Sequence, residues 1–104
     1  AKAAVDKKNK QGKTPLMVAA YHSNPIVVKK LLSAKANVNL CDEHGNTELS
    51  LAARHGSVSV VKLLLSAKAN VKAKDKQGMS VLYWALQFGN EACVKLLRGA
   101  GAKK

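Results

Sequence analysis

Acidic and aromatic residues are scarce in this chain. Its 104 residues include 18 Lys and Arg against 6 Asp and Glu, which gives a formal net charge of +12 at pH 7, and aromatic residues make up only 4%. So few carboxylates argue against an enzyme that uses a carboxylate pair. So few aromatics argue against a module that stacks nucleic-acid bases. The positive charge instead favours weak, long-range attraction to acidic partners or polyanions.

Cysteine and long apolar runs are also scarce. Cys41 and Cys93 have no CxxC spacing and no paired histidines, so we interpret them as two reduced thiols, with Cys93 buried. No apolar run approaches the roughly 20 residues that span a bilayer, and no signal-peptide pattern opens the chain. We therefore expect an intracellular protein, cytoplasmic or nuclear, without membrane insertion.

Motifs that carry catalysis or bind cofactors are missing as well. There is no glycine-rich phosphate loop, and no serine lies on a nucleophile elbow. His22, His44 and His55 lack short ligand spacing and supporting acids or cysteines, so exposed polar contacts are the favoured interpretation over a metal site. We expect no enzyme activity, no catalytic residue, no cofactor and no metal.

What the chain does contain is a repeat of 33 residues. Gly12, Gly45 and Gly78 align, and blocks 9–41 and 42–74 are identical at 17 of 33 positions. A period of this length is typical of stacked-repeat proteins, whose core lies between neighbouring units. We therefore expect one repeat domain over 1–104, divided into the tail of a preceding repeat and three repeats: 1–8, 9–41, 42–74 and 75–104.

The middle repeat illustrates the unit. Residues 42–45 predict a tight turn with glycine available for positive φ. Thr47 is a good N-cap for a short helix over 47–55, which Gly56 ends. Residues 58–65 place their apolar side chains on one broad stripe of a second helix. Both helices are too short to be stable alone, so packing between repeats must hold them.

Residues 12–20, Gly-Lys-Thr-Pro-Leu-Met-Val-Ala-Ala, resemble the signature of the ankyrin repeat. The Val-Val and Leu-Leu runs of the second helices and the Ala-x-Val-Asn segment at 36–39 extend the resemblance over essentially the whole chain. It implies an all-α solenoid of stacked helix-turn-helix units with short hairpin-like turns. Where the family has glycine after the second helix, this chain has Lys35 and Lys68, each costing up to about 1 kcal/mol if the left-handed conformation is kept.

The two ends of the array show polar substitutions. Lys30 occupies a position held by leucine in the other repeats, and so does Arg98. Both fit capping repeats with a polar outer face. A short self-contained stack, natural or engineered, and a fragment of a longer array both remain open interpretations.

The resemblance also implies where a partner binds, because ankyrin recognition uses turn tips and first helices that line a concave groove. These positions vary between the repeats while the framework stays fixed. Trp84 is left out, because it replaces Val18 and Leu51 and we expect it to be buried. The candidate partner-binding residues are Lys10, Lys13, Tyr21, His22, His44, Asn46, Arg54, His55, Met79, Gln87 and Phe88.

Two function classes follow. The favoured one is a monomeric, non-catalytic scaffold that binds a protein partner, of acidic character if the charge guides encounter. The alternative is a polyanion-binding element, for nucleic acid or an acidic membrane surface, that uses the repeated Lys29, Lys62 and Lys95. We favour the first, because rows of like charge on exposed helix faces are common.

Overall fold

The computed structural model describes residues 6–55 and 57–102, and this part of the chain forms helices joined by turns. All the helices have seven to nine residues. The middle pair starts and ends within one residue of the predicted ranges, while Gly56 lies outside the described residues. The helices are α1 (Pro15–Tyr21), α2 (Pro25–Ser33), α3 (Glu48–His55), α4 (Val58–Ser66), α5 (Val81–Gln87) and α6 (Glu91–Gly99).

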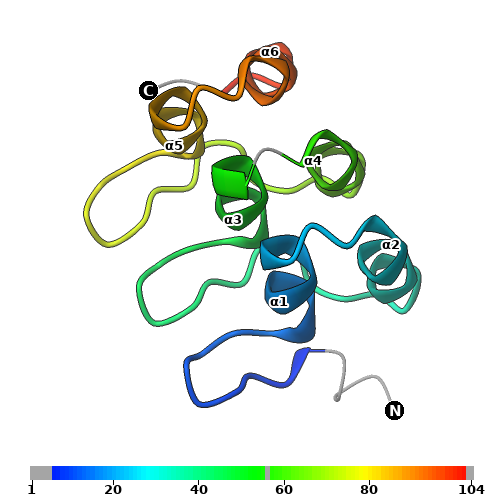
Figure 1. Cartoon of the computed structure of the whole chain (residues 1–104). Coiled ribbons are helices and arrows are strands. Elements are labelled where there is room, and N and C mark those ends of the chain that lie inside the picture. The colour runs from blue at the N-terminus through cyan, green and yellow to red at the C-terminus, as the bar shows by residue number, and fades with distance from the viewer. Residues whose placement is uncertain (1–5, 56, 103–104) are drawn as a thin grey trace.

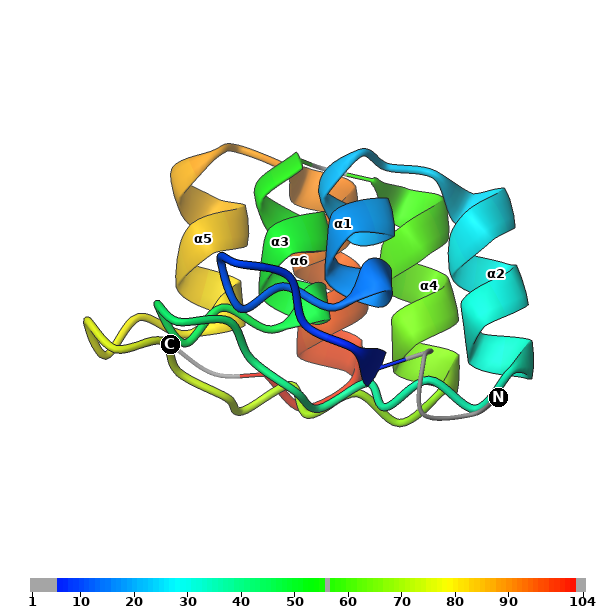
Figure 2. The same cartoon turned by 90° about the horizontal axis from the view of Figure 1, so that it is seen from below.

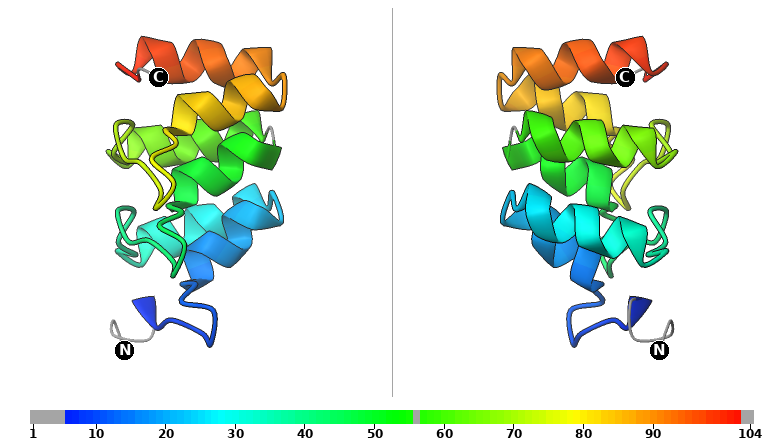
Figure 3. Two further views of the ribbon diagram at one scale, coloured as in Figure 1. Left: turned by 90° about the vertical axis from the view of Figure 1, so that its left-hand side faces the viewer. Right: turned by 90° about the vertical axis from the view of Figure 1, so that its right-hand side faces the viewer.

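The helices form two rows. The first helices of the repeats, α1, α3 and α5, stack in one row, and α2, α4 and α6 stack beside them (Figure 1). The repeats follow one another in chain order along the stack (Figure 3). The turn tips lie on the side of α1, α3 and α5, away from the second row (Figure 2). The described ranges contain no strand, only isolated bridges such as Cys41 with Thr47. The predicted all-α solenoid is confirmed.

The first helices begin where the hydroxyl residues predict. Thr14 and Ser80 each accept a hydrogen bond from the backbone N–H three residues later, at 3.2 and 3.1 Å. Thr47 accepts one from Ser50 at 3.3 Å. These bonds satisfy N–H groups that have no partner within the helix. After the second helices, Lys35 and Lys68 do adopt positive φ, 71° and 69°.

The core lies between the repeats. Leu49, Ala52, Val61 and Leu64 of the middle repeat have no exposed surface. The thiol of Cys93 is also buried, whereas Cys41 is exposed. No repeat could bury these side chains by itself, so contacts between neighbouring repeats stabilise the stack.

A carboxylate or amide side chain anchors each turn. Oδ1 of Asp42 accepts hydrogen bonds from the backbone N–H groups of His44 and Asn46, both at 2.9 Å. Asp75 and Asn9 hold the third and first turns in the same way. This geometry fixes the turn tips relative to the helices that follow them.

The second and third turns also touch each other at Gly45. Gly45 has φ +81°, and a Cβ there would lie 2.8 Å from the backbone nitrogen of Lys76. That nitrogen donates to the carbonyl of His44 at 3.1 Å. Gly78 has nearly the same φ, +80°, but a Cβ there would meet nothing within 4 Å.

This pair gives a matched prediction for stability. We expect Gly78→Ala to lower the free energy of unfolding by about 1 kcal/mol through the left-handed conformation alone. Gly45→Ala should cost roughly 1 kcal/mol more, because the backbone must move and the bond between the turns weakens. Urea denaturation of both variants measures the difference. Equal losses would mean that the turns are not in close contact.

Candidate functional site

The sequence-predicted contact residues lie on the turns and on the first helices, and most are exposed. Tyr21 and Phe88 are the large apolar ones, 47% and 57% exposed. Arg54 is half-buried. The other exposed members are Lys10, His22, His44, His55 and Gln87, and the other half-buried ones are Lys13 and Met79.

Asn46 differs from the expectation, because it is buried. Its amide Nδ2 donates to Asp42 at 3.3 Å, and its Oδ1 accepts from Arg54 at 3.0 Å. A side chain so engaged positions its neighbours and presents little surface to a partner. The sequence could not reveal this, because asparagine at a turn is usually exposed.

Aromatic rings connect the first two repeats on this face. The ring of Tyr21 meets the imidazole of His55 edge-on, with centroids 4.6 Å apart, and it lies 5.3 Å from the ring of His22. Edge-to-face pairs at such distances are favourable. They hold Tyr21 and His55 against each other while Tyr21 remains largely exposed.

Trp84 connects the second and third repeats, contrary to the expectation that it is a core residue. Of the three equivalent positions only Leu51 is buried; Trp84 is half-buried and Val18 is 36% exposed. The guanidinium carbon of Arg54 lies 4.0 Å from the centroid of the Trp84 ring. The indole Nε1 donates to Oδ2 of Asp75 at 3.0 Å. Trp84 stays at the surface because its polar edge and one ring face are both engaged there.

These contacts form two groups, which meet at the consecutive residues Arg54 and His55 of α3. The ring of Phe88 stacks on that of Trp84, with centroids 6.2 Å apart. We call Tyr21, His55, Arg54, Trp84 and Phe88 the aromatic–cationic strip. Sequence reasoning missed Trp84, although two signals were present: it is the only tryptophan, and it lies nine residues after the turn aspartate Asp75.

Lys13 lies beside this strip but is bound within the fold. Its ammonium is 2.7 Å from Oδ2 of Asp42, whose side chain is fully buried. Burial alone would raise the pKa of Asp42, but hydrogen bonds from Lys13 and from the backbone of Asn46 and His44 outweigh it and lower the pKa. The pair links the first repeat to the second, so Lys13 is only partly available to a partner.

Two hollows accompany the strip. One, of about 390 Å³, is lined by Lys13, Tyr21 and His22 among others. The second, of about 320 Å³, lies between the second and third turns and includes Arg54 and Trp84. Lys10, Met79 and Gln87 line neither hollow.

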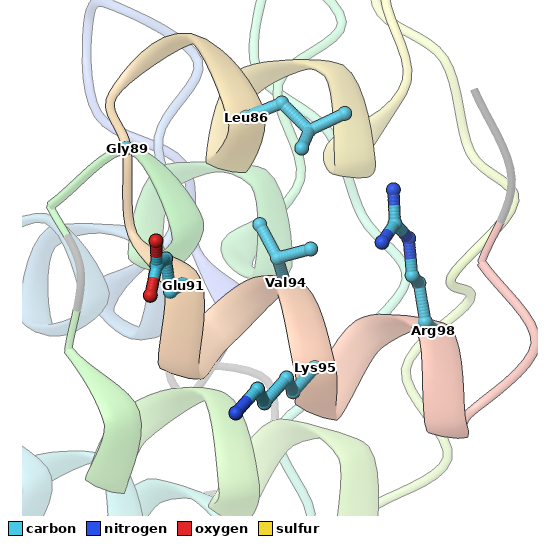
Figure 4. Close-up of a pocket in the computed structure, with 6 residues that line it drawn as sticks. All are labelled: Leu86, Gly89, Glu91, Val94, Lys95 and Arg98. Atoms are coloured by element: carbon cyan, nitrogen blue, oxygen red, sulfur yellow. The ribbon is translucent and has the colours of Figure 1, made fainter.

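Another hollow, of about 410 Å³, lies at the α5–α6 end of the stack. The side chains of Leu86 and Val94 face it, and Arg98 extends beside it (Figure 4). The equivalents of the two apolar residues in the middle repeat, Ala53 and Val61, are fully buried. This hollow is therefore a stacking face of the repeat rather than a separate site.

The opposite face carries the repeated lysines. Lys29, Lys62 and Lys95 are exposed on α2, α4 and α6, and the first two border a shallow hollow of about 400 Å³. We call these three residues the lysine row. None of the ring contacts found in the described residues involves this row.

The described ranges bring together no group of three His, Cys, Asp or Glu side chains suited to a metal ion. Nor do those ranges include a helix with the length and apolar character needed to cross a bilayer.

Comparison with known families agrees with this architecture. Residues 16–104 match the family model for ankyrin repeats, in three copies. The chain belongs to the ankyrin repeat family. A search of curated proteins gives no match. Ankyrin repeats generally act as protein–protein interaction modules and are typically non-catalytic.

Proposed function

We propose that this ankyrin-repeat chain is a non-catalytic scaffold whose protein partner lies across the turn tips and the first helices. The observation that supports this most directly is that contacts of the aromatic–cationic strip cross both boundaries between the repeats. Tyr21 reaches His55 of the next repeat, and Arg54 reaches Trp84 of the one after. One partner segment could therefore contact all three repeats at once.

The composition of the strip suits binding. Exposed aromatic side chains and arginine carry much of the binding energy at protein interfaces. Here Tyr21, Arg54 and Trp84 lie on helices and Phe88 is the C-cap of α5, and Arg54 and Trp84 also hold each other in place. Side chains that are ordered before binding lose less conformational entropy when the partner arrives. The lysine row has charge but no such anchors.

Once a partner has been identified by affinity capture, the contribution of the aromatic side chains to binding is tested by comparing Phe88→Ala with Ile26→Ala. Both residues are exposed apolar side chains, Phe88 in the strip and Ile26 on α2 in the second row, 57% and 68% exposed. We expect Phe88→Ala to weaken binding by more than about 1 kcal/mol and Ile26→Ala to change it little. Calorimetric titration measures both. A larger loss for Ile26→Ala would place the interface on the other face.

The contribution of Arg54 to binding is tested by removing one positive charge from each face of the stack. Arg54→Ala should weaken binding by more than about 1 kcal/mol, whereas Lys62→Ala should have little effect. Circular dichroism checks that both variants remain folded. If Lys62→Ala and Lys95→Ala dominate instead, and binding falls steeply with salt, the lysine row is the working surface and the partner is a polyanion.

A further inference from the structure

We propose that the hollow around Arg54 and Trp84 binds a carboxylate side chain, glutamate or aspartate, of an acidic segment in the protein partner. The proposal deepens the scaffold function above and rests on it. We call this site the Arg54 hollow. It is bordered by two turns and two first helices, and its other charged or polar members include Asp75, Lys76 and Gln77.

The Arg54 guanidinium is held flat and in place. Its plane is supported by the indole of Trp84 at 4.0 Å, while Nη2 donates to Asn46 at 3.0 Å and lies 3.9 Å from Asp75. A planar guanidinium so fixed offers a carboxylate two parallel N–H groups with little loss of entropy. An ammonium group in the same place could not provide that fork.

Most donors of this guanidinium remain free for a ligand. Guanidinium has five N–H donors, and within the described residues the structure gives Arg54 a single hydrogen bond, to Asn46. The Nε also has no partner there, but it is buried and cannot reach a ligand. The side chain is 27% exposed, and Nη1, which makes no hydrogen bond, is not among the buried unpartnered atoms of the described residues, so the terminal nitrogens are the donors that a carboxylate would meet.

The carboxylate already present does not fill this role. Asp75 is 5% exposed at its side chain, and its two oxygens accept three hydrogen bonds, from Trp84 Nε1 and from two backbone N–H groups of its own turn. Arg54 and Lys76 contribute two positive charges against the one negative charge of Asp75, so the hollow keeps a net positive charge. Any charge on His44 would be balanced by Glu43, which lies 3.6 Å from it, so Arg54 and Lys76 supply the excess.

Trp84 makes the site observable, because it is the only tryptophan of the chain. A glutamate-rich peptide is titrated into the full chain while the Trp84 emission is followed, and a peptide with glutamine in place of every glutamate is the control. We expect saturable binding of the first peptide, at least about tenfold tighter than that of the second, because only the carboxylate pairs with the guanidinium.

Variants separate specific pairing from general attraction to a basic protein. Arg54→Lys keeps the charge but removes the fork, and it should weaken binding of the glutamate peptide by about tenfold. Lys76→Ala, on an exposed turn, should weaken it several-fold. Lys62→Ala, of the lysine row, should leave it within about twofold. Circular dichroism confirms that the variants are folded.

The following results would overturn the proposal: equal binding of the two peptides, or an Arg54→Lys variant that binds like the parent chain. Displacement of the peptide by inorganic phosphate at concentrations where glutarate has no effect would assign the hollow to phosphate and also reject it. If these tests fail while Phe88→Ala still weakens binding of the captured partner, only the carboxylate site is lost and the scaffold function stands.

Discussion

Replacement of Leu64 with alanine is expected to lower the free energy of unfolding by roughly 2–5 kcal/mol, the usual range for a fully buried leucine. Leu64 lies on α4, in the second row between α2 and α6, and has no exposed surface. The cavity that the shorter side chain leaves cannot collapse easily, because both neighbouring repeats hold the surrounding side chains in place. Since small domains are stable by only about 5–15 kcal/mol, the loss is a large part of the total.

The control for this prediction is Leu63→Ala on the same helix. Leu63 is half-buried, so its truncation removes less buried surface and should cost clearly less. Urea denaturation followed by far-UV circular dichroism gives the free energies, and the Trp84 emission reports on the third repeat separately. If the two variants lost equal stability, the assignment of Leu64 to the core between repeats would be wrong.

The fold was predictable because its determinants recur. Turn glycine, hydroxyl cap and leucine run appear three times and the alanine pair appears twice, so each repeat tests the interpretation of the others. The left-handed conformation of Lys35 and Lys68 was predictable for the same reason, since the third repeat has Gly101 at that position and it too has positive φ. A periodic signal is therefore enough to place helices and turns.

The candidate site was less predictable because its contacts do not recur. Arg54 and Trp84 occupy different repeat positions and meet only across a repeat boundary. The burial of Asn46 also depends on side-chain contacts found once, with Asp42 and with Arg54 eight residues later in the same repeat. Pairings of this kind depend on side chains found once in the chain, so periodicity carries no information about them.

Glu48 is the clearest case of a residue whose role periodicity could not reveal. It replaces the proline expected at the start of a first helix, and its side chain has no exposed surface. Oε2 accepts a hydrogen bond from the hydroxyl of Thr14 at 3.4 Å, whereas Oε1 has no partner among the described residues. A buried carboxylate with so little compensation is costly when ionised.

The environment of Glu48 favours its neutral form. Burial raises the pKa of this carboxyl to about 7, from an ordinary value of 4.5. The backbone N–H of Glu48 itself and the hydroxyl of Thr14 oppose the shift. Among more distant charges Asp6 raises the pKa and Lys8 lowers it. Protonation of Glu48 near neutral pH therefore favours the packed interface between the first and second repeats.

We expect folding stability to fall between about pH 4.5 and pH 7 because of this residue. The pKa is higher in the folded than in the unfolded state, so the contribution of Glu48 is complete below the unfolded value and is lost as pH rises through the folded one. With about 1.4 kcal/mol per pKa unit, the loss is about 3 kcal/mol. The pKa of Asp42 is lowered on folding. Its contribution to stability therefore changes with pH in the opposite direction and is lost as the pH falls.

Comparison of the parent chain with Glu48→Gln isolates this contribution, because Asp42 and the histidines cancel in the difference. At pH 8 the variant should be more stable by about 1–3 kcal/mol, since a neutral amide avoids the buried charge but still leaves polar atoms to satisfy. At pH 4.5 the advantage should disappear. Glu43→Gln, on the exposed second turn, is the control for loss of a carboxylate at the surface. Urea denaturation at the two pH values measures each difference, and a Glu48→Gln advantage that is constant with pH would show that Glu48 does not titrate with the fold.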